Sequence, residues 1–234
     1  MLVMPANNTG WQAHCLARET GRLGHLFSPG AHRGPYPWFP YALDNGAFSC
    51  WDMSSNEFND TAWEKMLPKW RELLFWAQCQ EHKARWAIVP DVVGNATRTL
   101  KRWGEYAPMV QDAQIPLAIA VQDGMTVQQV RRLEIQPEVI AIGGTTDWKW
   151  KTVNQWVEAF PRVHVLRCNM PAKLYDLEAM GVESCDGTGW FMGDSKKLKG
   201  LERWAYSRAV PTTTLVTSYN SRITKREAKQ LLLA

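Results

Sequence analysis

The sequence lacks several features that would assign it to a class at once. It has no apolar run approaching the roughly 18 consecutive residues of a membrane span. Its opening residues, MLVMPANNTG, lack the basic-then-apolar order of a signal peptide, so we expect a cytoplasmic protein without a membrane partner. Its five cysteines are odd in number and form no CxxC or CxC pair, which argues against a disulfide framework or a cysteine-rich zinc site.

Linkers, internal repeats and low-complexity segments are also missing, so we expect one domain over residues 1–234. With 45% apolar residues, a chain of 234 residues can bury one full hydrophobic core and is short for two. No glycine fingerprint for dinucleotide phosphates follows the first apolar segment, which makes an open doubly wound sheet the weaker of two α/β alternatives.

The net charge of +4 is unevenly distributed along the chain. In the basic C-terminal segment 195–234, nine Lys or Arg accompany two Glu, so this segment carries +7 and the preceding 194 residues carry −3. A basic segment on a near-neutral body suits a polyanion such as DNA. The predicted nucleic-acid-binding residues are Lys196, Lys197, Lys199 and Arg203. A merely solvated helix face is the alternative interpretation.

Seven apolar segments have the continuous character of strands that are buried on both faces, as in a parallel sheet. They are residues 2–6, 41–46, 86–94, 117–124, 139–144, 163–168 and 182–187, with 212–219 as a candidate eighth. Apolar residues at helical spacing predict helices over 61–77, 151–160 and 171–180. Pro171 and Gly181 are a typical start and stop for the last helix. This alternation predicts a compact, single-domain (β/α)8 TIM-like barrel.

Polar residues follow the predicted strands in a repeated pattern, an acid or amide beside glycine. In a barrel the carboxyl ends of all strands surround one mouth, where the functional groups lie. The residues at these ends are Asp44, Asp91, Gln122 with Asp123, the turn Gly143-Gly144-Thr145, and Asp186. A single aspartate after a strand is more commonly a turn or cap residue. Because the pattern repeats at equivalent barrel positions, it predicts a shared site.

The residue types at this predicted site suit a planar, purine-like heterocycle. A carboxylate binds the N–H edge of such a ring, an amide its carbonyl edge, backbone N–H groups a further acceptor, and an aromatic ring its face. The groups that match are Asp91, Gln122, the backbone at Gly144 and Thr145, and Phe48.

Two carboxylates, Asp44 and Asp186, then remain for catalysis. In retaining glycosyl transfer one carboxylate attacks a sugar carbon while the other moves a proton, so the pair fits that chemistry. A metal centre is the competing use of several aspartates. The only histidine near a strand end is His164, which we expect in the core or at a strand start, so we predict no metal.

Five segments of the chain resemble, in the same order, segments of one known family. They are LDNGAFS (43–49), VPDVVG (89–94), AVQDG (120–124), IAIGGTT (140–146) and HVLRCNMPAKLYDLEAMGVESCDGTG (164–189). The family is that of the tRNA-guanine transglycosylases and their DNA-acting relatives, the DpdA-type 7-deazaguanine transglycosylases. The resemblance spans roughly residues 40–190, and it lies in the order of the five segments more than in any single one.

The first three segments imply one catalytic and three base-binding residues. LDNGAFS resembles TDSGGFQ of the family, which implies that Asp44 is the general acid/base and that Phe48 stacks on the base. VPDVVG is similar to the segment whose aspartate binds the heterocycle, which here is Asp91. AVQDG resembles IVQGG, which implies that Gln122 also binds the base.

The last two segments imply the turn and the nucleophile. IAIGGTT resembles the GGLAVGE turn, which implies base contacts from Gly143, Gly144 and Thr145. The final segment is similar to RYLMGVGTPEDLLEAVARGVDMFDC, whose last aspartate is the nucleophile. By this resemblance, Asp186 is the nucleophile.

The chain also departs from the family. The tRNA enzymes continue with PTR and a C-x-C-x-x-C…H zinc subdomain, whereas this chain has GTGWFMGDSKKLKG and no such cysteines. The resemblance therefore implies the DNA-acting branch, phage-encoded and in the host cytoplasm, without zinc or another cofactor. Its members exchange guanine in DNA for a free 7-deazaguanine base, preQ0 or a derivative, through a covalent aspartyl-deoxyribose intermediate.

Two other functions remain as alternatives to this reading. One is a carboxylate-based nucleoside or glycoside hydrolase, with water as the acceptor. The other is a non-catalytic DNA-binding barrel protein that uses the basic segment and some of the 13 tryptophans. A barrel alone does not separate these functions, because many chemistries share that fold.

Overall fold

The structure, a computed structural model, describes residues 1–6, 10–32, 34–55 and 57–207. Eight parallel strands form one sheet in the order β1-β10-β9-β8-β7-β6-β3-β2. They are β1 (Leu2–Pro5), β2 (His25–Phe27), β3 (Tyr41–Leu43), β6 (Ala87–Ile88), β7 (Leu117–Val121), β8 (Val139–Ile142), β9 (Val163–Val165) and β10 (Ser184–Gly187). Two isolated bridges, Val3 with Leu23 and Ala6 with Leu26, connect β1 to the β2 side, so the sheet is a nearly closed barrel.

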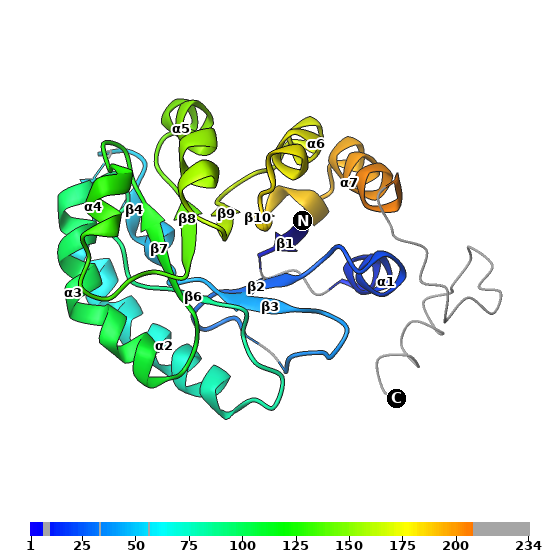
Figure 1. Ribbon diagram of the computed structural model, residues 1–234. Coiled ribbons are helices and arrows are strands. Elements are labelled where there is room, and N and C mark those ends of the chain that lie inside the picture. The colour runs from blue at the N-terminus through cyan, green and yellow to red at the C-terminus, as the bar shows by residue number, and fades with distance from the viewer. Residues whose placement is uncertain (7–9, 33, 56, 208–234) are drawn as a thin grey trace.

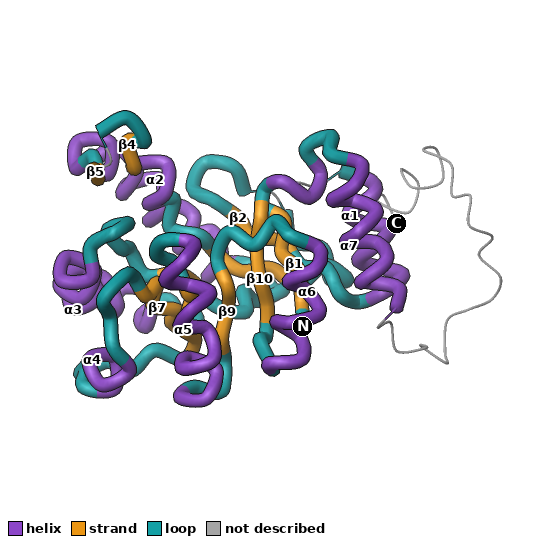
Figure 2. Tube along the Cα trace, turned by 90° about the horizontal axis from the view of Figure 1, so that it is seen from above, coloured by secondary structure: helices purple, strands orange, loops and turns teal. Residues whose placement is uncertain are grey.

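Helices lie in chain order around this barrel, as Figure 1 shows. They are α1 (Trp11–Thr20), α2 (Asp60–Cys79), α3 (Ala96–Asp112), α4 (Val127–Arg131), α5 (Thr146–Ala159), α6 (Pro171–Met180) and α7 (Ser195–Ser207). Two 3-10 turns, η1 (Ala47–Cys50) and η2 (Gly189–Phe191), and the antiparallel pair β4 (Trp51–Asp52) and β5 (Glu57–Phe58) complete the list. Helices α1 and α7 lie side by side in both views (Figure 2). The predicted (β/α)8 fold is confirmed.

Local sequence signals explain where several helices begin and end. The Asn59 side chain accepts a hydrogen bond from the Ala62 N–H and so caps the N-terminus of α2. Helix α6 begins at Pro171 and ends before Gly181, which adopts the left-handed conformation with φ 89°. Helix α5 begins at Thr146, five residues before the predicted start at residue 151, because Thr145 caps its N-terminus.

The core has two layers, which follow from alternation along the strands. Residues that face outward pack with the helices and include Val3, Leu43 and Val165. Residues that face inward fill the barrel and form a separate cluster to which no helix contributes a residue. They are Met4, Leu26, Ala42, Trp86, Ile88, Ala118, Ala120, Val139 and Ala141. The barrel is therefore a packed interior rather than a pore, as in other (β/α)8 proteins.

The strand predictions need correction for one strand that they omit and for the length of several others, while one predicted strand is not tested. The barrel contains β2, at His25–Phe27, which we did not predict because three residues show no clear period. The candidate eighth strand at 212–219 lies outside the described residues. Several strands are also shorter than their apolar segments, since the chain leaves the sheet before Asp44 and before Asp91.

Within the described part of the chain, no helix has the length and apolar character that a bilayer crossing requires.

Candidate active site

A polar layer closes the barrel interior at the carboxyl ends of the strands. The inward row of β7, Ala118 and Ala120, continues to Gln122, and that of β3 continues from Ala42 to Asp44. On β10, Asp186 follows the outward-facing Cys185, so Asp186 faces inward as well. Side chains that are far apart in the sequence thus meet at one mouth.

Asp44 and Asp186 share this mouth and interact electrostatically. Burial first, and then the charges of Asp186 and Asp91, raises the pKa of Asp44 to about 6. The Ser28 hydroxyl lies 3.2 Å from Oδ2 of Asp44, and the Asn45 N–H donates to Oδ1 at 2.9 Å. A carboxyl group with a pKa near 6 exchanges its proton near neutral pH, which is what a general acid/base needs.

Asp186 has a different environment from Asp44. It is 6% exposed, and its Oδ1 accepts the Arg167 N–H at 2.9 Å and lies 3.2 Å from Nε2 of His164. Within the described part of the chain, Oδ2 has no hydrogen-bond donor. The two carboxyl groups therefore differ, since Asp186 has two nitrogen partners at a single oxygen, whereas Asp44 has a raised pKa.

Asp91 lies at the centre of a buried network. Its Oδ1 accepts Nδ2 of Asn45 at 2.8 Å, and its Oδ2 accepts Nε2 of Gln122 at 2.6 Å. Burial raises the pKa of Asp91, although the hydrogen bond from Asn45 and the charge of Arg102 oppose that rise. Each carboxylate oxygen can accept more than one hydrogen bond, so Asp91 retains acceptor capacity for a ligand N–H.

The predicted backbone turn is already engaged within the protein. The Gly144 N–H and the Gly94 N–H both donate to Oε1 of Gln122, at 3.2 and 3.1 Å. Thr145 donates its N–H and its hydroxyl to the Asp123 carboxylate, at 2.7 and 2.6 Å. Gly143 donates its N–H to the Val121 carbonyl. Base contact through these amides remains a prediction and would require these partners to move.

Phe48 lies on the rim and is covered on one face by a planar cation. It is 48% exposed, and the Arg167 guanidinium lies 4.6 Å from its ring centroid. The same guanidinium donates to the Gly144 carbonyl at 2.6 Å. Arg167 itself has φ 57°, so its backbone amide points toward Asp186 while its side chain covers Phe48. A planar group, the Arg167 guanidinium, therefore already occupies one face of this ring.

A buried lysine lies beneath this loop. Lys149 of α5 is 3% exposed and donates to the Leu166 carbonyl, next to Arg167. Burial and the charge of Arg167 lower the pKa of Lys149 to about 8, while Asp186 opposes that shift. Lys149 thus holds the carbonyl of Leu166, and the next backbone N–H, that of Arg167, donates to Asp186.

Three residues of this site were missed or misjudged from the sequence. His164 is in the core, as expected, yet it also contacts Asp186. Asn45 and Arg167 were not identified as partners of the aspartates. The available signal was alternation: His164 lies between Val163 and Val165, which face the helices, so its side chain must face the barrel interior.

The basic residues of α7 lie beside the mouth loop that follows β10. Lys196, Lys199 and Arg203 are exposed, whereas Lys197 is half-buried and lies 3.7 Å from the Asp194 carboxylate. Leu201 and Trp204 anchor the other face of α7 in the core. Three of the four predicted nucleic-acid-binding residues are thus free of ion pairs to other described residues. The rest of the basic segment, 208–234, lies outside the described residues.

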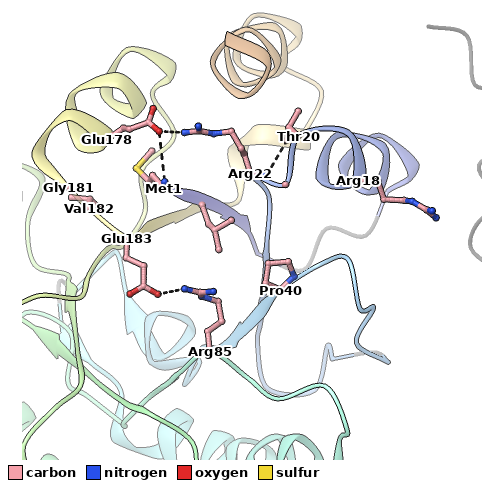
Figure 3. A pocket seen from close by; sticks show the side chains of 12 residues that line it. Met1, Arg18, Thr20, Arg22, Pro40, Arg85, Glu178, Gly181, Val182 and Glu183 are labelled. Carbon is pink, nitrogen blue, oxygen red and sulfur yellow. Dashed lines mark hydrogen bonds and ion pairs between the residues drawn. The ribbon is translucent and has the colours of Figure 1, made fainter. Parts of the chain in front are cut away.

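A cavity of about 830 Å³ lies at the opposite end of the barrel. Its lining residues precede the strands, and Figure 3 shows Arg22 paired with Glu178 and Arg85 with Glu183. Burial alone would raise the pKa of Glu183, but hydrogen bonds from Arg162 and Arg85 lower this pKa to about 2. In (β/α)8 proteins this face serves stability and the other face serves chemistry.

Comparison with known proteins places this chain in no family: no family model matches it, and no curated protein does. Within the described residues, no three His, Cys, Asp or Glu side chains form a group suited to a metal ion. The site must therefore be interpreted from its own chemistry, which consists of two unlike carboxyl groups, a buried carboxylate–amide network and an exposed aromatic ring.

Proposed function

We propose that this chain is a pentosyltransferase that exchanges guanine in DNA for a free 7-deazaguanine base, preQ0 or a derivative. The observation that carries the proposal is the unlike pair Asp44 and Asp186 in one barrel mouth, with a pKa of about 6 for Asp44. When two carboxyl groups have different environments, one can act as the acid and the other as the nucleophile. This pair therefore fits a double displacement at a sugar carbon.

In the first step, Oδ2 of Asp186 attacks C1′ of the target nucleotide. The bond from C1′ to the guanine nitrogen breaks, its electron pair goes to that nitrogen, and Asp44 supplies the proton. In the second step, the ionised Asp44 takes a proton from the incoming 7-deazaguanine, whose nitrogen attacks C1′ and releases Asp186. Two inversions retain the configuration, and one glycosidic bond replaces another without an external energy source.

Base recognition falls to the buried network and to Phe48. Asp91 accepts an N–H of the base, and Gln122 offers the second hydrogen of its Nε2 to a base acceptor. The exposed ring of Phe48 provides a stacking face, once Arg167 moves or stacks on the opposite side of the base. The target base must leave the DNA stack to reach this mouth, because C1′ is inaccessible inside a duplex.

The test is incorporation of labelled 7-deazaguanine into DNA, together with detection of a protein–DNA adduct on denaturing gels. Asp186→Asn is expected to abolish the adduct and to lower exchange by about 10⁴-fold or more. Asp176→Asn removes an exposed carboxylate of α6 and is the matched control, which should exchange at the wild-type rate.

Other outcomes of the same assay identify the rival functions. Release of free base without incorporation would indicate a hydrolase, and salt-sensitive DNA binding without either product would indicate a non-catalytic DNA-binding protein. Exchange by Asp186→Asn at the wild-type rate would refute the nucleophile assignment.

A further inference from the structure

A chain of three polar side chains runs along the inside of the barrel below the mouth. Ser184 and Asp186 are both on the inward row of β10, and His164 lies opposite them on β9, where it pairs in register with Ser184. Nδ1 of His164 lies 2.8 Å from the Ser184 hydroxyl, and its Nε2 lies 3.2 Å from Oδ1 of Asp186. His164 and Ser184 are fully buried, at 0% exposure.

The partners determine the tautomer of the imidazole. An ionised carboxylate only accepts hydrogen bonds, so Nε2 must carry the hydrogen that faces Asp186. In the neutral imidazole Nδ1 is then an acceptor, which the Ser184 hydroxyl satisfies by donating to it. The Trp86 ring lies 4.6 Å from the imidazole, so the ring is packed as well as hydrogen-bonded. The hydrogen bonds therefore run in one direction, from Ser184 through His164 to Asp186.

We propose that His164, oriented by Ser184, is a positioning residue for the nucleophile Asp186. This inference rests on the proposed function. Together with the Arg167 N–H, Nε2–H of His164 binds Oδ1 and leaves Oδ2 without a donor among the described residues. The carboxylate thus has one oxygen for orientation and one for attack.

The same two donors act again when the covalent intermediate is resolved. After Oδ2 has bonded to C1′, Oδ1 is the carbonyl oxygen of an ester and still accepts both N–H groups. As the bond from C1′ to Oδ2 breaks, negative charge returns to the Asp186 carboxylate, and the donors stabilise it. Preorganised donors aimed at an oxygen that gains charge lower the barrier, as in an oxyanion hole.

Three variants separate this role from a merely structural one. His164→Leu removes the donor, and we expect exchange at saturating substrate to fall about 10²- to 10³-fold. His164→Gln keeps an N–H near the same place and should retain exchange to within about tenfold. Ser184→Ala removes the hydroxyl that orients the imidazole ring and should cost about tenfold. The affinity for DNA is expected to be unchanged in all three, so kcat falls and KM does not rise.

A second measurement does not depend on activity. The ¹⁵N shifts of the imidazole distinguish the two tautomers, and the His164→Gln spectrum assigns the signal among the five histidines. We expect the Nε2–H tautomer both in the wild-type protein and in Ser184→Ala, because Asp186 requires a donor in either protein. An Nδ1–H tautomer in the wild-type protein would overturn the inference, with or without enzymatic activity.

The two proposals fail in different ways. If the wild-type chain exchanges bases and His164→Leu, while folded, does so at the same rate, the positioning role is wrong and the transglycosylase stands. If the wild-type chain forms neither adduct nor product but has the Nε2–H tautomer, the proposed function fails and the hydrogen-bond chain remains a property of the barrel.

Discussion

The side-chain amide of Gln122 donates to Oδ2 of Asp91 at 2.6 Å and joins the loop after β7 to the loop after β6. Both residues are buried, at 2% and 5% exposure. The neighbouring strand ends are thus held together by a carboxylate–amide pair inside the candidate site. Because an amide and a carboxylate have the same shape but different charge, this contact can be tested with a nearly isosteric change.

Gln122→Glu is expected to make the folded state unstable as pH rises. It places two carboxyl groups in contact, so they share a proton and the pKa of the pair rises above the unfolded values. The variant should match the wild type near pH 4 and lose up to about 1.4 kcal/mol per pH unit above it, until the shared proton is released. Urea unfolding at several pH values measures this loss. Gln128→Glu on the exposed face of α4 is the control and should show no such trend.

Asp44→Asn tests the raised pKa of Asp44 directly. A folded-state pKa of about 6, above the ordinary value of 3.8, means that the folded protein binds more protons than the unfolded chain between those values. Wild-type stability therefore falls as pH rises from about 4 to about 6, by on the order of 2 to 3 kcal/mol. Asparagine does not ionise, so Asp44→Asn lacks this pH-dependent loss of stability. The variant should be more stable than the wild type at pH 7.5 but not at pH 4.

The same variant separates stability from activity. Asp44→Asn should lose exchange activity while its free energy of unfolding increases, because the buried charge is unfavourable for folding and useful for proton transfer. Asp112→Asn, at the exposed end of α3, is the matched control and should change neither quantity. A variant whose stability follows the wild-type pH profile would contradict the raised pKa.

Gly144→Ala should destabilise the mouth. Gly144 has φ 68°, and a Cβ there would lie 2.4 Å from Oδ2 of Asp123 and 2.8 Å from Cε3 of Trp148. We expect a loss of about 2 to 4 kcal/mol, because backbone strain and overlap act together. Gly104→Ala is the matched control: it lies within α3 with no atom near its added Cβ, and it should gain about 0.5 to 1 kcal/mol. Equal effects of the two changes would refute the explanation.

The exposed lysines of α7 are expected to contact DNA phosphates. For Lys196→Gln with Lys199→Gln, the slope of log affinity against log salt should become shallower by about 2, since each phosphate contact contributes about 0.9 in duplex DNA. The control pair, Lys65→Gln with Lys151→Gln, makes the same charge change on α2 and α5. Titrations at several salt concentrations measure the slopes. An unchanged slope for the α7 pair would remove these residues from the interface.

Much of this protein is determined by local sequence. Pro171 and Gly181 limit α6, and Asn59 caps α2, because these residues satisfy helix ends through short-range interactions. The apolar segments predicted seven of the eight barrel strands, and the acids after them predicted the mouth. Such features depend on a few neighbours in the chain, so they can be read from the sequence.

Other features were decided only by the tertiary structure. His25–Phe27 becomes strand β2 because it pairs with β3, and its three residues show no period of their own. The contact of His164 with Asp186 follows from the register of β9 against β10, and the cover of Phe48 by Arg167 follows from a left-handed residue in the loop after β9. Register and loop conformation depend on the whole barrel closing, so residue types along the chain do not reveal which side chains meet.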